Sequence, residues 1–332
     1  MVEDGFMAYK TIDGLMRHLR NNGIAIQGSS QKCQLSNTGY FHGYKGYRFF
    51  QHSSRRLPFV SYEEVYATIQ YDAKLKALFY DKMMFIETAL KNIALECILN
   101  EARSESIQDM YDRVISSYKN SPANFTNEQR QKAQQNKLNL QSTIQSYLSK
   151  NYRESNPKIT HFYNNPSYAG VPIWALFEVM TMGDFGFLLS CLTLDTRKAI
   201  SKRLCLNTSC DTNLQLIYKY VYTLKDLRNA IAHNSAVFDT RFRKIDPTGA
   251  MKRCLEIEFS LPYINFKTIG DYVILMCYML KRLKVSKTEI KAFIRSFERI
   301  TEEYKQSVNL NVSDIVIHPD LQSRLQILKS KI

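Results

Sequence analysis

Hydrophobic residues recur at helical spacing over long, unbroken stretches of this chain. Residues 62–100 contain neither proline nor glycine, and their apolar positions follow a period of 3.6 residues. Such a stripe predicts one long amphipathic helix with a buried face. The stripe consists of Val65, Ile69, Phe79, Met83, Ile86, Leu90, Ile93 and Cys97.

The same spacing predicts shorter helices on either side of the long one. The first lies near the N-terminus and stops at Asn22-Gly23, a pair typical of helix ends. Residues 259–265 are a candidate extended piece. The pattern as a whole predicts an all-α fold, a helical bundle. After residue 170, helices are expected at 171–183, from Asp211 through residue 233, at 271–283 and at 287–304.

Changes in composition divide the chain into three parts. Residues 1–58 are predicted to form an aromatic-rich helical module, 59–310 a helical domain, and 311–332 a C-terminal tail or helix. Within the domain, residues 101–170 are more polar and are predicted to be an insert. Its Gln/Asn-rich part is expected to be a solvated helix, because Leu138, Leu140, Ile144 and Leu148 recur there, followed by a loop over 151–170.

The aromatic residues of the N-terminal part have two possible roles. Tyrosines and phenylalanines alternate with glycines over residues 39–50. We favour aromatics that plug one end of the helical core. The alternative is an exposed aromatic and basic strip that stacks on RNA.

The charge of the chain indicates the kind of partner. Lys and Arg number 45 against 31 Asp and Glu, which gives a net charge of +14. An excess of this size favours a polyanionic partner, and nucleic acid is the commonest one. The alternative is a basic protein that binds no polyanion.

Cysteine usage and hydropathy predict a cytoplasmic chain without a metal site. The seven cysteines are scattered and form no Cys-x-x-Cys pair, so we expect reduced thiols, no structural zinc and no other cofactor. The segment Met1-Val2-Glu3-Asp4-Gly5 carries acids where a signal peptide needs basic residues. The longest apolar run, 272–280, is too short to cross a bilayer.

One segment carries the candidate chemistry, Leu227-Arg228-Asn229-Ala230-Ile231-Ala232-His233-Asn234. Arginine holds a phosphate with a charged, planar donor fork, and histidine exchanges protons near neutrality. RNA brings its own nucleophile, the 2′-hydroxyl, so cleavage needs a base, an acid and positive charge on the phosphorane. We predict that His233 is the general base or acid and Arg228 the phosphate ligand. Asn229 is expected to donate to a phosphoryl oxygen or to hold the histidine ring.

This chemistry has a defined product. Attack by the 2′-hydroxyl leaves a 2′,3′-cyclic phosphate and a free 5′-hydroxyl, and no metal takes part. DNA lacks the attacking hydroxyl and is expected to resist.

Helix geometry indicates that one copy of the segment is half a site. Each helical residue turns by about 100°, so Asn229 and His233 share a face, whereas Arg228 lies about 140° around from His233. A second copy across a groove would supply the other half, and symmetric dimers are the commonest way to bring two copies together. We therefore expect a homodimer with a composite site.

A carboxylate on the long helix is a candidate supporting residue. Glu87 lies at the edge of the apolar stripe, one turn from Met83 and Leu90, where a charge is costly unless it is paired. It is expected to form a salt bridge that anchors helices, or to orient the pair Arg228 and His233. The first role is favoured.

Residues 226–234 resemble the signature of the HEPN superfamily, which is an arginine and a polar residue followed a few positions later by a histidine. Three further blocks resemble the abortive-infection (Abi) proteins of the AbiD/AbiF type. They are a tyrosine-rich block at 35–47, a family helix with Tyr66, Asp72, Leu75, Ile86-Glu87 and Leu90-Lys91, and a proline-tryptophan-glutamate-glycine helix at 172–183. The four blocks keep the family's order over roughly residues 10–240.

The resemblance implies a HEPN-like helical bundle, a bacterial anti-phage role and an RNase that halts growth of the infected cell. It places Arg228, Asn229 and His233 in the active site, and it implies that some members work with a small noncoding RNA. Some HEPN toxins have a tyrosine two residues after the histidine, a target of inactivating nucleotidylation. Ser235 occupies that position here, so control of that kind is not expected.

Two other functions are compatible with the same residues. One is an RNA-binding protein without catalysis, which holds a small noncoding RNA through the same groove. The other is a purely structural helical protein in which Arg228 pairs with Glu87.

Overall fold

The structure, a computed structural model, describes residues 11–332, so the segment Met1–Gly5 used above lies outside the described residues. Within the described part the chain is helical, with isolated β-bridges and no β-strand, which confirms the all-α prediction. In chain order the elements are α1 (Ile12–Asn21), α2 (Gly28–Thr38), the π-helical turn η1 (Tyr40–Lys45), α3 (Tyr62–Ala102), α4 (Ile107–Asp109), the π-helical turn η2 (Met110–Val114), α5 (Asn127–Arg153), α6 (Pro157–Asn164), α7 (Ile173–Val179), α8 (Met182–Cys191), α9 (Leu194–Arg203), α10 (Leu216–Ala232), α11 (Gly249–Phe259), α12 (Ile269–Arg282), α13 (Lys287–Ser307), α14 (Leu310–Val316) and α15 (Leu321–Lys331).

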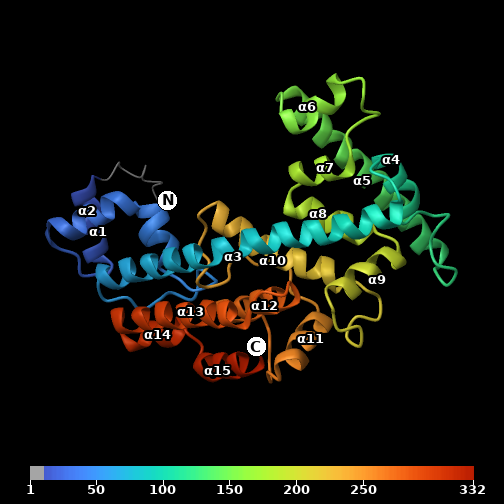
Figure 1. The fold of residues 1–332 in the computed structure, drawn as a ribbon. Helices are drawn as coiled ribbons and strands as arrows, with labels where there is room; N and C mark the ends of the chain where they lie inside the picture. Colours follow the sequence, from blue (N-terminus) through green and yellow to red (C-terminus); the bar gives the residue numbers. More distant parts are fainter. Residues whose placement is uncertain (1–10) are drawn as a thin grey trace, which may run out of the picture.

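Helix α3 crosses the whole molecule and is the axis on which the other helices pack (Figure 1). Its 41 residues give a length of about 60 Å. A capping box between Ser61 and Glu64 starts the helix, and Arg103 ends it with a left-handed φ of 52°. The sequence-based prediction of one long helix over 62–100 is confirmed.

The core lies between α3 and the C-terminal helices. Every residue from Ile269 to Leu280 in α12 is buried, so the longest apolar run of the sequence is an internal helix of the bundle. Helix α13 lies along α3, and the rings of Tyr71 and Tyr304 stack between them at 4.4 Å. Among residues 11–332, no helix combines the length and the apolar character needed to cross a membrane.

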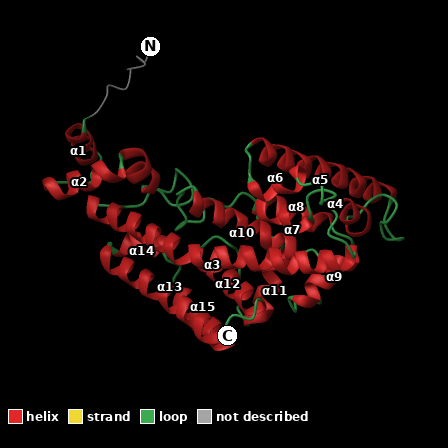
Figure 2. Ribbon diagram, turned by 45° about the horizontal axis from the view of Figure 1, so that its top comes forward, coloured by secondary structure: helices red, strands yellow, loops and turns green. Residues whose placement is uncertain are grey.

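The elements occupy two sides of α3. Figures 1 and 2 both show α5 and α6 on one side and α13 and α15 on the other. The N-terminal elements α1, α2 and η1 pack near the start of α3. There Tyr44, Tyr47 and Phe50 are buried, as expected for aromatics that close one end of the core, whereas Phe41 is 65% exposed.

The polar insert is more helical than predicted. Helix α5 buries only Leu140, Ile144 and Leu148, which confirms a solvated helix, but Leu138 is half exposed and lies off the buried stripe. The predicted loop over 151–170 is wrong over much of its length, because α5 continues to Arg153 and α6 forms over Pro157–Asn164. The side chain of Asn156 accepts the N–H of Lys158, and Pro157 occupies the first helical position. An Asn-Pro pair that signals a turn is also a good helix start.

Two other predictions are corrected, and for residues 311–332 the helical alternative is found. The helix expected over 171–183 ends at Val179, because Met180 is extended and Thr181 caps a second helix, α8. The expected extended piece at 259–265 begins inside α11 and continues as a loop, without a strand partner. The C-terminal segment forms the two helices α14 and α15. Arg324 in α15 forms a buried ion pair with Asp271 in α12.

Candidate active site

Helix α10 carries the candidate residues and is fixed at its start and along its length. The buried Asp211 accepts the backbone N–H groups of Gln215 and Leu216, at 2.6 and 3.0 Å, and so satisfies donors of the first turn. On α8, a Cβ added at Gly186 would come within 3.2 Å of the Tyr222 ring. The absence of a side chain at Gly186 therefore lets α8 and α10 approach closely.

Helix α10 ends one residue before the histidine. His233 is the C-cap residue, with φ −95° and ψ 13°, and its N–H bonds to the Asn229 carbonyl at 2.9 Å. Asn234 is left-handed, with φ 52°, and Ser235 donates its N–H to the Ala230 carbonyl at 2.8 Å. These bonds form a Schellman motif with asparagine in the position usually taken by glycine. The expectation that the histidine lies inside the helix is therefore corrected: the motif places it at the helix end.

Arg228 is held by a carboxylate of α3. Its Nε donates to Glu87 Oε2 at 3.2 Å, and the other Glu87 oxygen pairs with Lys91 at 3.0 Å. Lys91 also donates to the carbonyl of Met180, the residue between α7 and α8, at 2.7 Å. The expected pairing of Glu87 is thus found, with two cations on one carboxylate. The Arg228 side chain remains 31% exposed.

Asn229 is oriented by Arg228. Its Oδ1 accepts from Arg228 Nη1 at 3.3 Å, which leaves the amide NH₂ to donate elsewhere. A guanidinium has five N–H donors, and these two bonds use two of them. No further partner of the Arg228 fork occurs among residues 11–332. The end of the fork remains able to bind a bidentate anion.

His233 is the exposed member of the three residues. Its side chain lies at the surface, and within the described part of the chain its ring makes no hydrogen bond or ion pair. Arg228 makes its contacts with Glu87 and Asn229 and none with His233. One helix therefore joins Arg228 to Asn229 by a hydrogen bond and forms none between Arg228 and His233 among the described residues, in line with the angular separation of about 140°.

The backbone beyond His233 is held by a second carboxylate of α3. Asp72 is fully buried, and its Oδ1 accepts the N–H groups of Val237 and Phe238 at 2.6 and 2.8 Å. Its Oδ2 accepts the hydroxyl of Tyr47 at 2.7 Å and pairs with Lys76 at 3.0 Å. Burial and the neighbouring carboxylate raise the pKa of Tyr47, which stays a neutral donor.

Lys76 extends this network to the helix end. Its Nζ bonds to the Asn234 side-chain oxygen at 2.5 Å. The residue next to His233 is thereby linked to α3. Asp72 and Lys91 occur in the family-like blocks of the sequence, but sequence reasoning gave them no role, and it did not single out Lys76. The i,i+4 spacing of Glu87 and Lys91 was the available signal for Lys91.

Metal ligands do not gather near these residues. Within residues 11–332, no group of three or more His, Cys, Asp or Glu side chains is arranged to hold a metal ion. Cys97, Cys191, Cys254 and Cys277 are buried free thiols. Burial raises the pKa of the Cys191 thiol to about 11.

Comparison with known proteins identifies the family. Neither a curated protein nor a solved structure was found to match the chain. The family model described as Abi-like protein matches residues 33–239, more than half of the 332 residues. This range contains α3, α10, and both carboxylates that hold the candidate segment. The chain belongs to the Abi-like protein family.

Proposed function

We propose that this Abi-like protein is a metal-independent endoribonuclease of the HEPN type that acts in abortive infection, in the bacterial cytoplasm. The observation that carries the proposal is the end of α10. There, among residues 11–332, an exposed histidine whose ring makes no hydrogen bond or ion pair follows an arginine and an asparagine that keep donors able to bind an anion. Two phosphate ligands and a proton-exchanging ring at one helix end meet the needs of RNA cleavage.

The chemistry assigns one role to each side chain. His233 takes the proton of the 2′-hydroxyl, whose oxygen attacks the adjacent phosphorus and forms the 2′,3′-cyclic phosphate. The bond from phosphorus to the 5′-oxygen breaks, and that oxygen takes a proton from a second acid. Arg228 and Asn229 donate to the phosphoryl oxygens, on which negative charge develops.

A second copy of the chain completes this scheme. Within residues 11–332 of one chain, Arg228 makes no hydrogen bond with His233, so a second copy can supply the missing partner at the phosphate. A homodimer that places two α10 ends across one groove combines Arg228 of one copy with His233 of the other at one phosphate. The net charge of +14 suits the binding of RNA, including a small noncoding RNA, along such a groove.

The ion pair of Arg228 with Glu87 also fits a structural protein without catalysis. Glu87 would form the same ion pair with Arg228 whether it orients an active-site arginine or only joins two helices. His233 separates the two functions, because it makes no side-chain contact that the fold uses within residues 11–332.

The test is cleavage of RNA by purified His233→Ala in the presence of a chelator. Wild type is expected to cleave with the chelator present and to leave 2′,3′-cyclic phosphate ends, and His233→Ala to lose at least about a hundredfold in rate. The variant should unfold at the wild-type temperature. His42→Ala, which changes another exposed histidine, is the matched control and should cleave normally.

Two outcomes would reject the proposal. Persistent cleavage by His233→Ala would remove the histidine from the chemistry. Tight, salt-dependent binding of one co-purifying RNA, detected by absorbance at 260 nm and sequencing, without cleavage by wild type would favour the RNA-binding protein.

A further inference from the structure

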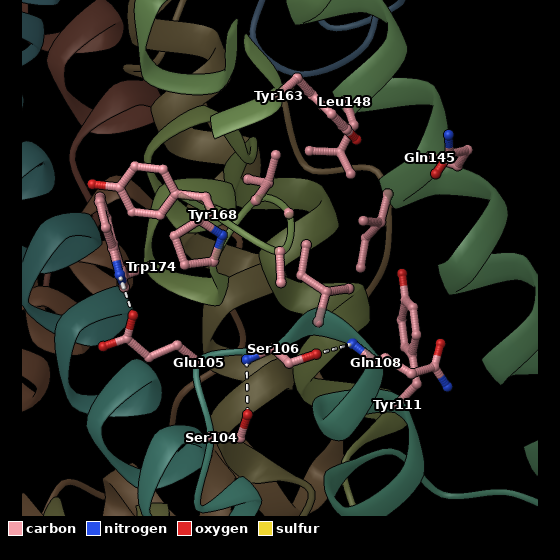
Figure 3. A pocket seen from close by; sticks show the side chains of 16 residues that line it. Ser104, Glu105, Ser106, Gln108, Tyr111, Gln145, Leu148, Tyr163, Tyr168 and Trp174 are labelled. Carbon is pink, nitrogen blue, oxygen red and sulfur yellow. Dashed lines mark hydrogen bonds between the residues drawn. The ribbon is translucent and has the colours of Figure 1, made fainter. Parts of the chain in front are cut away.

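A separate cleft lies between the insert and the start of α7. Its volume is about 560 Å³, within the usual range for small-molecule sites. The walls come from the segment 104–111, from one face of α5 and from residues 163–174, and no residue of α10 takes part. Figure 3 shows these side chains around an open centre.

One wall of the cleft consists of exposed aromatic rings. Tyr163, Tyr168 and Trp174 are each 40–47% exposed, which is high for rings of this size. Behind them Phe162 packs edge-on against Tyr168 and Trp174, at 4.9 and 5.2 Å. The Trp174 indole also donates to Glu105 Oε2 at 3.1 Å (Figure 3). The rings are thus held in place while 40–47% of each side chain stays exposed, which suits stacking of another flat ring.

The opposite wall presents groups with donors or acceptors that no residue in the described part of the chain uses. Tyr111 is only 8% exposed, yet its hydroxyl makes no hydrogen bond within the described part of the chain and lies at the cavity end of the ring (Figure 3). The hydroxyl is not among the fully buried polar atoms without a partner, so water in the cleft reaches it and a ligand can replace that water. Gln145 lines the same wall, and Gln108 uses its NH₂ for Asp112 at 2.8 Å, which leaves its amide oxygen.

The charge of the lining indicates what kind of ligand fits. The chain has 45 Lys and Arg residues, but none lines this cleft. A phosphate would therefore find no cation inside. A cationic ligand would find one carboxylate, Glu105, with one oxygen already bonded to Trp174. Aromatic faces, a phenol and two amides instead match an uncharged heteroaromatic ring with polar edges.

Cations lie just outside the cleft. Gln145 also borders a shallower depression lined by Lys150 and Arg153, farther along α5. A ring bound in the cleft would direct an attached sugar and phosphate toward those side chains.

We propose that this cleft binds a nucleobase, stacked on the rings of Tyr168 and Trp174 and hydrogen-bonded by Tyr111. The base belongs either to a free nucleoside or nucleotide, or to an unpaired position of an RNA strand. The site is distinct from Arg228 and His233, so it does not depend on RNA cleavage and can be tested on the His233→Ala variant.

The chain contains a single tryptophan, Trp174, so its fluorescence reports on this cleft directly. The full chain is titrated with adenosine, guanosine, cytidine and uridine, and with single-stranded RNA oligomers of each base. Isothermal titration calorimetry checks the dissociation constants. Saturable quenching by at least one nucleoside is expected. A 5′-phosphate should strengthen binding by roughly threefold to tenfold, because no cation lines the cleft itself but Lys150 and Arg153 lie just outside it. A free ligand is indicated if the nucleoside binds as tightly as the oligomer. An RNA base is indicated if the oligomer binds at least about tenfold tighter and its binding weakens with salt.

Two variants test the assigned contacts. Tyr111→Phe removes only the unpaired hydroxyl and should weaken binding roughly threefold to tenfold, and Tyr168→Ala should weaken it about tenfold or more. Tyr80→Phe, an exposed tyrosine on α3, is the matched control and should bind like wild type.

The proposal is overturned if no nucleoside or oligomer binds at millimolar concentration, or if both cleft variants bind like wild type. It is also overturned if tetramethylammonium quenches Trp174, the nucleosides do not, and Glu105→Gln abolishes that effect. The cleft would then be a cation site.

Discussion

A single carboxylate holds two cations beside the candidate active site. Glu87 is nearly buried, and Arg228 and Lys91 each bond to one of its oxygens. The cluster carries a net positive charge, which suits a phosphate ligand more than a closed, neutral pair would. Because Arg228 is about one-third exposed, solvent screens its part of the interaction, and positioning is the larger effect expected of Glu87.

Replacement of Glu87 by glutamine separates positioning from stability. Glu87→Gln keeps the size of the side chain and removes its charge, so Arg228 loses the anchor that aims its fork. We expect a loss of about 1–2 kcal/mol in the free energy of unfolding, measured with urea, and a fall in cleavage rate of roughly tenfold or more. Glu96→Gln, on the same helix, loses only the exposed pair with Arg203 and should change stability by less than about 0.5 kcal/mol. A Glu87→Gln protein that is destabilised but cleaves at the wild-type rate would assign the pair to the fold alone.

At the scale of elements, α3 holds the candidate segment at successive points. Asp72 bonds to the backbone of Val237 and Phe238, Lys76 to Asn234, and Glu87 to Arg228. The residue numbers of the partners fall as those of the α3 residues rise. Helix α3 and the segment 228–238 therefore run in opposite directions. A long, straight helix thereby fixes both sides of His233 without contact to its ring.

The left-handed residue after His233 controls where the histidine lies. Asn234→Gly should keep stability within about 0.5 kcal/mol, because glycine adopts this backbone freely, whereas Asn234→Val should cost about 1–2 kcal/mol. Thermal unfolding followed by circular dichroism measures both. Cleavage is expected to fall in the valine variant even at temperatures where it is fully folded, because the cap that places His233 is strained. Equal activity and stability of the two variants would contradict this role.

The sequence predicted the long elements well and the breaks poorly, for a physical reason. A stripe such as that of α3 extends over many turns, so packing and local preference agree. Breaks are decided by one or two residues that serve two purposes. The pair Asn156-Pro157 signals a loop in the sequence, yet it also starts α6. The helical pattern runs through Met180 without a break, but the chain is extended there and the Met180 carbonyl accepts a hydrogen bond from Lys91. Such a bond joins residues far apart in the sequence and leaves no local pattern.

The same limit applies to the candidate site. Arg228, Asn229 and His233 form a local motif and could be named from the sequence, and the unfavourable position of Glu87 on the apolar stripe predicted its need for a partner. The contact of Asp72 with Val237 could not be foreseen, because backbone N–H groups have no sequence signature. The helix end at Ala232 depended on Asn234, which takes the left-handed conformation less often than glycine.

At the scale of the whole molecule, the question is whether one chain contains a complete site. In one chain the fork of Arg228 binds Glu87 and Asn229, while His233 caps the helix end and its ring makes no hydrogen bond or ion pair within residues 11–332. A site that combines Arg228 of one copy with His233 of the other needs both chains. The strongest consequence of the proposed dimer is therefore that inactive chains can restore each other.

Mixing two inactive variants tests whether the site is shared. Arg228→Ala and His233→Ala should each be inactive alone. After joint unfolding and refolding at equal amounts, about half of the dimers contain one chain of each kind, and such a dimer keeps one arginine and one histidine on different chains. If a cleavage event uses Arg228 of one copy and His233 of the other, the mixture should recover up to roughly a quarter of wild-type activity, since only one of two orientations is intact. Size-exclusion chromatography with light scattering checks that dimers form. The double variant, Arg228→Ala with His233→Ala, is mixed with wild type in the same way and controls for the exchange of chains between dimers. A mixture that forms dimers and stays inactive would show that the two residues must come from one chain, or that both histidines are required together.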